Sequence, residues 1–543
     1  MLSYRKLAMR VLGRPLYTGG NDSPRPASQR AAAFILTAAM LTTLAAPAFA
    51  KTWHIEDGDI TVKAGDTKGT NKVSQGESTD VPDTDTVITN REKNASSHTV
   101  TIETNDKNDK VEVTLKDVNI DTGSRNKAAV SVTGEGDTNI KLDGDNALKS
   151  DIYRSGIYGS GSGSLTISGG ENDSLTAQGG SGANGISSSG SLTISGGTVT
   201  ANGDDGGHGI YSRGGVTISG GSTVTANGES GTISGGDGIC SNGGVTISGG
   251  STVTANGGNG GSLVGGDGIR SGGGLTVSDG TVTAKGGNGD SKDGYGGDGI
   301  RSGGVVTISG NTVNAAGGYG GKVGGYGICS FDRVAISGGT VEAAGGNGST
   351  GGGSGIYSSD IDLSGSLELT AKAGSPSGRA LSQNGDELDL NTIKDKLSPG
   401  AKVTATNANG ETKQVSIPRP VEPEKPVIPE ESSSSSDGGS SAPSAPASPL
   451  PGLTVTDKSG AVISYTSTQS GNTLTVCVGR LTASLRVSLA ALRPLRAEGI
   501  ETITFQTILC STTLSVDELL AMGGEAAEAV LTHRFTDSSL TVG

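Results

Sequence analysis

A glycine-isoleucine dipeptide recurs along the middle of this chain at intervals of 24 to 31 residues. Its eight copies begin at Gly156, Gly185, Gly209, Gly238, Gly268, Gly299, Gly327 and Gly355. A period of this length is typical of a solenoid, in which each unit is one small supersecondary element that buries its apolar face against its neighbours. The repeat therefore predicts a stack of like units rather than one globular core.

Within each unit, apolar and small polar residues alternate at period two, as in Val245-Thr-Ile-Ser248 and Val253-Thr-Ala255. This alternation predicts short β-strands bounded by glycine turns. Because such strands are too short to form a sheet within one unit, we expect each to pair with its equivalent in the next unit, about 4.8 Å away. The sequence predicts an all-β fold, a right-handed parallel β-helix with three short strands per coil of about 28 residues.

Stacked coils place like residues in interior columns. The first predicted column is Ile157, Ile186, Ile210, Ile239, Ile269, Ile300, Ile328 and Ile356. The second is Ile167, Ile194, Ile218, Ile247, Val277, Ile308, Ile336 and Leu363, and the third is Val199, Val224, Val253, Val282, Val313 and Val341. A narrow stacked core needs few large side chains, which fits a chain with 32% hydrophobic and 3% aromatic residues. We expect most of the 94 glycines at coil corners, where tight turns need positive φ.

Composition divides the rest of the chain. Residues 1–50 have a basic start, an apolar run and the ending Ala48-Phe-Ala50, which predicts a secretory signal cleaved after Ala50, with a retained anchor as the alternative. Residues 51–417 are predicted as the β-helix and residues 418–452 as a Pro/Ser-rich disordered linker. Residues 453–543 predict a small α+β module of unknown function, with a helix near 489–498 interrupted by Pro494.

The charge and hydropathy pattern excludes two classes of partner. The net charge is −14 and no basic stripe is present, so we expect no nucleic-acid binding, which depends on neutralised phosphates. No second apolar run of about 18 residues follows the signal, so no membrane span is expected in the mature chain. The prediction is a secreted or extracellular protein, with any attachment to the cell surface non-covalent.

Four cysteines allow one predicted disulfide. Cys477 and Cys510 both lie in the C-terminal module and could pair in an exported protein. Cys240 and Cys329 occupy the same repeat position three coils apart, which is beyond disulfide reach. A role as small apolar fillers is the alternative for all four.

The residue after each repeated isoleucine should point outward and form a column across the coils. This column includes Tyr158, Tyr211, Arg270, Arg301 and Tyr357, and Arg213 follows two residues after Tyr211. Tyrosines stack on sugar rings and arginines pair with carboxylates, so these six residues are candidates for carbohydrate binding. Ordinary surface variation is the alternative at each position.

The residue before the repeated dipeptide suggests a cation site. Asp237, Asp267 and Asp298 should form a ladder one strand spacing apart. Calcium would relieve their mutual repulsion, and its oxygen preference makes these three the candidate calcium ligands. The alternatives are exposed, solvated Asp-Gly turns, or neutralisation by Arg270 and Arg301.

A resemblance adds to this interpretation. The segments 115–120, 128–132 and 139–142, followed by the Leu-Thr-Ile-Ser-Gly-Gly-Thr-Val-Thr-Ala units, resemble the secreted bacterial β-helix proteins called carbohydrate-binding domain-containing proteins. The resemblance covers roughly residues 55–380 and implies a polysaccharide-lyase-like fold that binds acidic or plant-type polysaccharide with calcium. Its motifs are mainly structural, so it supports the fold more strongly than the ligand.

The predicted function is non-catalytic polysaccharide binding, assisted by calcium in one version. One alternative is a structural stalk or adhesin without glycan specificity. A second is a polysaccharide lyase, for which Arg213, Arg270 and Arg301 are the credible bases. The string Asp204-Asp-Gly-Gly-His208-Gly also resembles, in shuffled order, the acids and Gly-His-Gly of β-helix polygalacturonases, but its acids are too close to His208 to match that layout.

Overall fold

The computed structural model describes residues 50–123 and 125–418, and residues 452–542 with short gaps. Those gaps are 458–460, 464, 471, 479, 481, 498, 508–510, 523–526 and 535–536. The predicted signal and linker therefore lie outside the described residues, except for Ala50, Pro418 and Gly452 at their ends. The chain divides into two compact units, residues 1–423 and 424–543, which are described separately.

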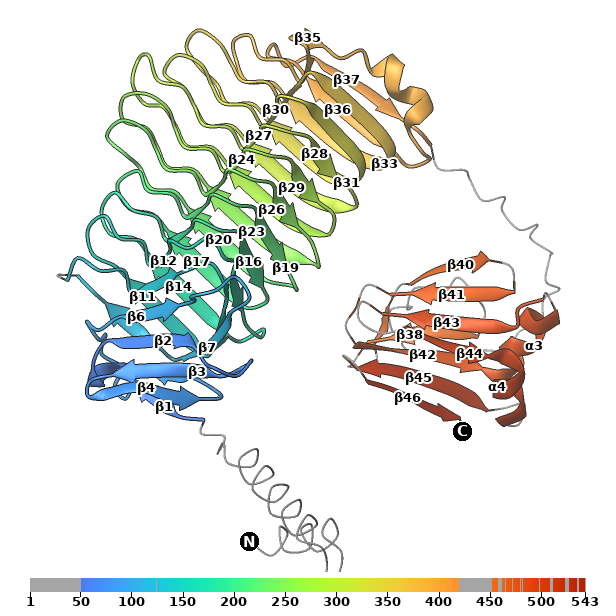
Figure 1. The fold of residues 1–543 in the computed structure, drawn as a ribbon. Helices are drawn as coiled ribbons and strands as arrows, with labels where there is room; N and C mark the ends of the chain where they lie inside the picture. Colours follow the sequence, from blue (N-terminus) through green and yellow to red (C-terminus); the bar gives the residue numbers. More distant parts are fainter. Residues whose placement is uncertain are drawn as a thin grey trace, which may run out of the picture. The chain divides into compact units, whose positions relative to one another are not determined.

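The first unit is a parallel β-solenoid of about 13 turns, whose coils follow one another along its length (Figure 1). A typical coil has three short strands, such as β21 (Ile239–Ser241), β22 (Val245–Ile247) and β23 (Ser251–Asn256). The first of these strands belongs to a 15-stranded sheet and the other two to a 22-stranded sheet. The predicted all-β class, the parallel stacking and the three strands per coil are confirmed.

In each sheet, the parallel strands follow one another in the order of the coils that contribute them. In the 15-stranded sheet the parallel strands are β2 (Ile60–Ala64), β6 (Val100–Glu103), β9 (Val130–Thr133), β12 (Ile157–Gly159), β15 (Ile186–Ser188), β18 (Ile210–Ser212), β21, β24 (Ile269–Ser271), β27 (Ile300–Ser302), β30 (Ile328–Ser330), β32 (Ile356–Ser358) and β34 (Leu381–Gln383). In the 22-stranded sheet the first strands are β1 (Thr52–His54), β5 (Val87–Thr89), β7 (Lys110–Lys116), β8 (Asn119–Asp121), β10 (Asp137–Asp143), β11 (Asp145–Lys149), β13 (Leu165–Ser168) and β14 (Ser174–Gln178). They continue with β16 (Leu192–Ser195), β17 (Thr198–Asn202), β19 (Val216–Ser219), β20 (Thr223–Asn227), β22, β23, β25 (Leu275–Val277), β26 (Gly280–Lys285), β28 (Val306–Ile308), β29 (Asn311–Ala316), β31 (Arg333–Ala344), β33 (Asp360–Lys372) and β36 (Lys402–Thr406).

The register aligns the predicted core columns. Ile239 pairs with Ile269, Ile247 with Val277, and Val253 with Val282 in successive coils. The isoleucines of the repeated dipeptide are fully buried, and residues of the other two columns are at most 1% exposed. All three predicted columns are therefore confirmed as the solenoid core.

Antiparallel strands close both ends of the stack. At the N-terminal end, β2 pairs antiparallel with β3 (Asn71–Gln75), which pairs with β4 (Ser78–Asp83); a short 3-10 helix, η1 (Ile55–Asp57), precedes them. At the other end, β36 pairs antiparallel with β37 (Thr412–Ser416) and β34 with β35 (Asp386–Glu387), beside the 3-10 helix η2 (Leu390–Lys396). These strands cover edges that would otherwise extend the parallel pairing.

The second unit is the predicted α+β module. One sheet contains β38 (Leu453–Thr456), β39 (Val462–Ile463), β42 (Thr482–Ser488), β45 (Glu528–Arg534) and β46 (Asp537–Val542), and the other β40 (Thr466–Ser470), β41 (Thr473–Cys477), β43 (Thr502–Gln506) and β44 (Ser511–Ser515). The helices are α3 (Leu489–Ala497) and α4 (Val516–Met522). Helix α3 continues through Pro494 instead of breaking there, and Leu492 and Phe505 are fully buried in the module core.

The glycine-rich loops depart from the expectation of positive φ. Some turn glycines have it, such as Gly220 and Gly221, both with φ near 69°. Many loop glycines instead have ordinary φ and lie against the backbone of a neighbouring coil. A Cβ on Gly287 would be 1.9 Å from the carbonyl oxygen of Gly258, and one on Gly297 would be 2.0 Å from that of Gly266. These glycines are needed for close approach between coils, which the repeat alone did not reveal.

Close approach can be tested by adding one methyl group. We expect Gly287→Ala to lower the free energy of unfolding by about 2 kcal/mol or more, because overpacking forces the backbone apart. Gly351→Ala is the matched control, since its Cβ would have no neighbour nearer than 3.6 Å and its φ is ordinary. Urea unfolding of both variants measures the difference, and equal stability would refute the packing explanation.

Candidate functional site

The aspartates before the repeated dipeptide form a hydrogen-bonded ladder. Oδ1 of Asp237 accepts the backbone N–H of Asp267, Oδ1 of Asp267 accepts that of Asp298, and Oδ1 of Asp298 accepts that of Tyr326, each at 2.7 Å. The three aspartates are only 3–5% exposed. The expected ladder is therefore present, and the alternative of exposed, solvated Asp-Gly turns is wrong because neighbouring coils cover these side chains.

The ladder continues into the preceding coils with other side chains. Nδ1 of His208 accepts the backbone N–H of Asp237 at 2.8 Å, and Oδ1 of Asn184 accepts that of His208 at 2.9 Å. At each step, a side-chain acceptor satisfies a main-chain amide in the next coil. This requirement explains why polar side chains are tolerated at this position, where the three aspartates are almost wholly buried.

Two arginines face the outer oxygens of the aspartates. Nη1 of Arg270 lies 3.6 Å from Oδ2 of Asp237 and Nε of Arg270 lies 3.7 Å from Oδ2 of Asp267, while Nη1 of Arg301 lies 3.4 Å from Oδ2 of Asp298. The arginine side chains are 49% and 37% exposed, so each spans from buried acid to solvent. The contacts that neutralisation by these arginines requires, one of the alternatives drawn from the sequence, are therefore present.

Burial controls the acidity of the ladder. Loss of solvation raises the pKa of Asp298 from 3.8 to about 6, against the lowering effects of the Tyr326 amide and of Arg301. Burial, then the charges of Asp298 and Asp237, raises the pKa of Asp267 well above its usual value. Both carboxyl groups therefore bind protons more tightly in the folded chain than in an unfolded one.

Calcium fits this ladder poorly. A calcium ion takes six to eight oxygen ligands. Here one oxygen of each carboxylate accepts a main-chain amide, and the other faces an arginine at 3.4–3.7 Å. The arginines thus occupy the side from which a calcium ion would bridge the three carboxylates. Calcium binding to the ladder stays a prediction.

Five of the six candidate sugar-binding residues share one line across the 15-stranded sheet. Strand pairing aligns Tyr158, Ser187, Tyr211, Cys240, Arg270, Arg301, Cys329 and Tyr357 in successive coils. At the strand spacing this line, here called the outer column, is roughly 34 Å long. Arg213 is exposed in the turn after β18 and lies outside it. Cys240 and Cys329 are 7% and 1% exposed, so the outer column is not uniformly open to solvent.

A shallow groove of about 260 Å³ lies along the middle of the outer column. Arg270, Arg301, Asn242 and Phe331 line it. Phe331 is 58% exposed, and the Arg301 guanidinium lies 5.2 Å from its ring centroid. Sequence reasoning missed Phe331 because it lies just beyond strand β30, outside the repeated pattern, although an aromatic residue is rare enough in this chain to have marked it.

Aromatic pairs flank this groove. The Tyr357 ring stacks on that of Tyr326 at a centroid distance of 4.9 Å, and the Tyr211 ring on that of His208 at 5.7 Å. Nδ2 of Asn242 donates to the Tyr211 hydroxyl at 3.4 Å. The tyrosine faces are therefore held by neighbouring coils rather than free to rotate.

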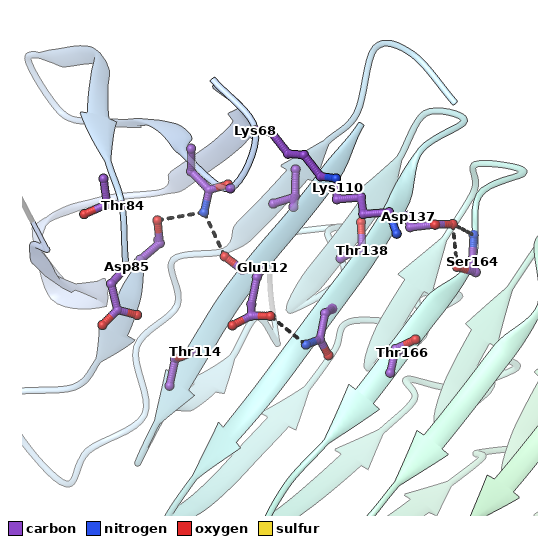
Figure 2. Close-up of a pocket in the computed structure, with 15 residues that line it drawn as sticks. Lys68, Thr84, Asp85, Lys110, Glu112, Thr114, Asp137, Thr138, Ser164 and Thr166 are labelled. Atoms are coloured by element: carbon purple, nitrogen blue, oxygen red, sulfur yellow. Dashed lines mark hydrogen bonds between the residues drawn. The ribbon is translucent and has the colours of Figure 1, made fainter. Parts of the chain in front are cut away.

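A larger hollow of about 510 Å³ lies at the N-terminal end of the 22-stranded sheet (Figure 2). Lys68, Asp85, Lys110, Glu112 and Asp137 line it, and it has no aromatic wall. Nδ2 of Asn71 donates to Oγ1 of Thr86 and to the carbonyl of Glu112, and Nδ2 of Asn139 donates to Oε2 of Glu112 (Figure 2). Because several of its polar groups already pair with each other, this hollow supports sugar binding less well than the groove.

Among the residues that the structure describes, no two cysteines form a disulfide. Cys240 and Cys329 are buried thiols, and Sγ of Cys477 lies 3.6 Å from Oε1 of Gln506. Cys510 lies outside the described residues, so the Cys477–Cys510 disulfide stays a prediction. Burial, with a contribution from nearby aspartates, raises the pKa of Cys240 and of Cys329 to about 12.

Comparison with known proteins finds no matching family model, curated protein or solved structure. The resemblance to carbohydrate-binding β-helix proteins therefore stays a prediction. Among the described residues, no helix has the length and apolar character needed to cross a membrane.

The buried ladder predicts a pH dependence of stability. Because the pKa of Asp298 is raised from 3.8 to about 6, its contribution is full below about pH 4 and is lost as the pH rises through 6. We expect the wild type to lose about 2 kcal/mol relative to Asp298→Asn between pH 4 and pH 7. The asparagine can still accept the Tyr326 amide. Urea unfolding of both proteins across this range measures the difference, and a pH-independent difference would contradict the assigned burial effect.

Proposed function

We propose that this protein is a secreted or surface-associated, non-catalytic protein that binds an acidic polysaccharide along the outer column. The observation that carries the proposal is the groove in which Arg270 and Arg301 stand on adjacent coils beside the exposed ring of Phe331. A polysaccharide is itself a repeating chain, so a row of similar groups across successive coils can contact several of its units.

The groove supplies two complementary interactions. Guanidinium groups bind carboxylates through paired hydrogen bonds, and an aromatic face packs against the apolar face of a sugar. Arg270 and Arg301 are held by buried aspartates yet remain partly exposed, so little conformational entropy is lost when they bind a ligand. Tyr211 and Tyr357 extend the same surface along the outer column.

The same geometry disfavours the lyase alternative. Burial alone would lower the pKa of Arg270, but the carboxylates of Asp237 and Asp267 raise it above its usual value. Arg270 therefore stays protonated and is a poor base for proton abstraction. Arg213 does not line the groove. Arg301 is therefore the remaining candidate base at the groove, and its Nη1 lies 3.4 Å from Oδ2 of Asp298.

The proposal predicts which substitutions weaken binding to pectin-type and other uronate-containing glycans on an array. We expect Arg270→Ala and Arg301→Ala each to weaken binding about tenfold or more, since each removes a charge-assisted hydrogen bond. Phe331→Ala should also weaken binding, and its exposure makes it harmless to folding. Arg333→Ala, which removes an exposed arginine paired with Asp360 on the other sheet, is the matched control and should bind like the wild type.

Running the array with and without calcium tests the predicted calcium assistance separately. Failure of every glycan to bind would overturn the proposal in favour of the stalk or adhesin. Release of unsaturated or reducing ends from the bound glycan would show an enzyme instead.

A further inference from the structure

Three side chains of different chemistry converge between two adjacent coils. A nitrogen of His208, a carboxylate oxygen of Asp237 and Sγ of Cys240 all lie within 4.8 Å of one another. His208 comes from the coil of β18, while Asp237 and Cys240 come from the coil of β21. Among the residues that the structure describes, this is the one such grouping of histidine, cysteine and acid side chains.

The carboxylate in this cluster has an unused oxygen. Oδ1 of Asp237 accepts the Asp267 amide, but Oδ2 is buried and has no hydrogen-bond partner among the described residues. The nearest side-chain nitrogens, Nδ1 of His208 at 3.5 Å and Nη1 of Arg270 at 3.6 Å, donate no hydrogen bond to it. A buried, unsatisfied carboxylate oxygen is costly and calls for a ligand.

We propose that His208, Asp237 and Cys240 bind a zinc-class divalent cation. Imidazole nitrogen, thiolate sulfur and carboxylate oxygen are the donors that such cations take in tetrahedral sites, and three protein ligands leave the fourth position for water or an external ligand. A sulfur and a nitrogen donor do not suit calcium, so this site is distinct in chemistry from the predicted calcium ladder. It does not depend on polysaccharide binding.

The surroundings can accommodate the cation. Binding forms a metal–sulfur bond while the Cys240 thiol releases its proton to solvent, with no change of oxidation state. Nδ1 of His208 accepts the backbone N–H of Asp237, so its lone pair already points toward that residue. A metal ion bound to Nδ1 replaces this amide as the partner of the lone pair. The Arg270 side chain can move away from Asp237 and keep its contact with Asp267, in which Nε of Arg270 lies 3.7 Å from Oδ2 of Asp267. The Tyr211 ring stacked on His208 holds the imidazole in place.

The chain itself supplies well-matched variants. Cys240→Ser removes the sulfur donor. His208→Asn removes the imidazole but keeps an acceptor for the Asp237 amide, as Asn184 does for His208 one coil earlier. Cys329→Ser is the control, because Cys329 is a buried thiol at the same repeat position three coils away and belongs to no such grouping among the described residues.

The test is a titration of the full-length, reduced protein with Co²⁺, followed by displacement with Zn²⁺. We expect one Co²⁺ per chain with thiolate-to-metal charge-transfer absorption, which Cys240→Ser abolishes and Cys329→Ser preserves. His208→Asn should weaken Co²⁺ binding at least tenfold, and Zn²⁺ should raise the Tm of the wild type but not of Cys240→Ser. Absence of charge-transfer absorption, or the same absorption in Cys240→Ser, would overturn the proposal.

Discussion

Main-chain pairing between successive coils is the interaction on which the rest of this structure depends. Each strand bonds to its equivalent one coil away, so residues at one repeat position are stacked at the strand spacing. The isoleucine and valine columns follow directly, because identical side chains one spacing apart fill a narrow interior. The glycine loops follow too, since between coils this close a carbonyl oxygen such as that of Gly258 leaves no room for a Cβ.

The same stacking explains how a charged ladder exists inside a thin solenoid. From His208 to Tyr326, each coil presents an amide at the position before the repeated dipeptide, and a side chain of the preceding coil accepts it. Asparagine, histidine and aspartate all meet that requirement. Aspartate adds a charge that must be balanced locally, which is the role of Arg270 and Arg301. The need to bond main-chain amides between coils thus places aspartates in the interior, and these aspartates orient Arg270 and Arg301 at the surface.

The regular features could be predicted from the sequence, while the irregular ones could not. The period and the alternation are local, so they were sufficient to predict the coil, the register of Ile239 with Ile269 and the stacking of the aspartates. Burial of Asp267, however, depends on cover from adjacent coils, and the role of Gly287 depends on which carbonyl lies opposite. The groove beside Phe331 depends on a residue just outside the repeat. None of these relations is encoded in one unit.

Departures from the repeat are therefore where specific chemistry can arise. A position that repeats unchanged is explained by stacking alone, because every coil imposes the same requirement there. His208 and Cys240 stand at two repeat positions whose residue changes from coil to coil, and the coil spacing brings both near Asp237. A solenoid can acquire a site in this way without altering its backbone, because the ladder that satisfies the amides also positions the donor atoms. The stacked backbone supplies the geometry, and the side chains that vary from coil to coil supply the donor atoms.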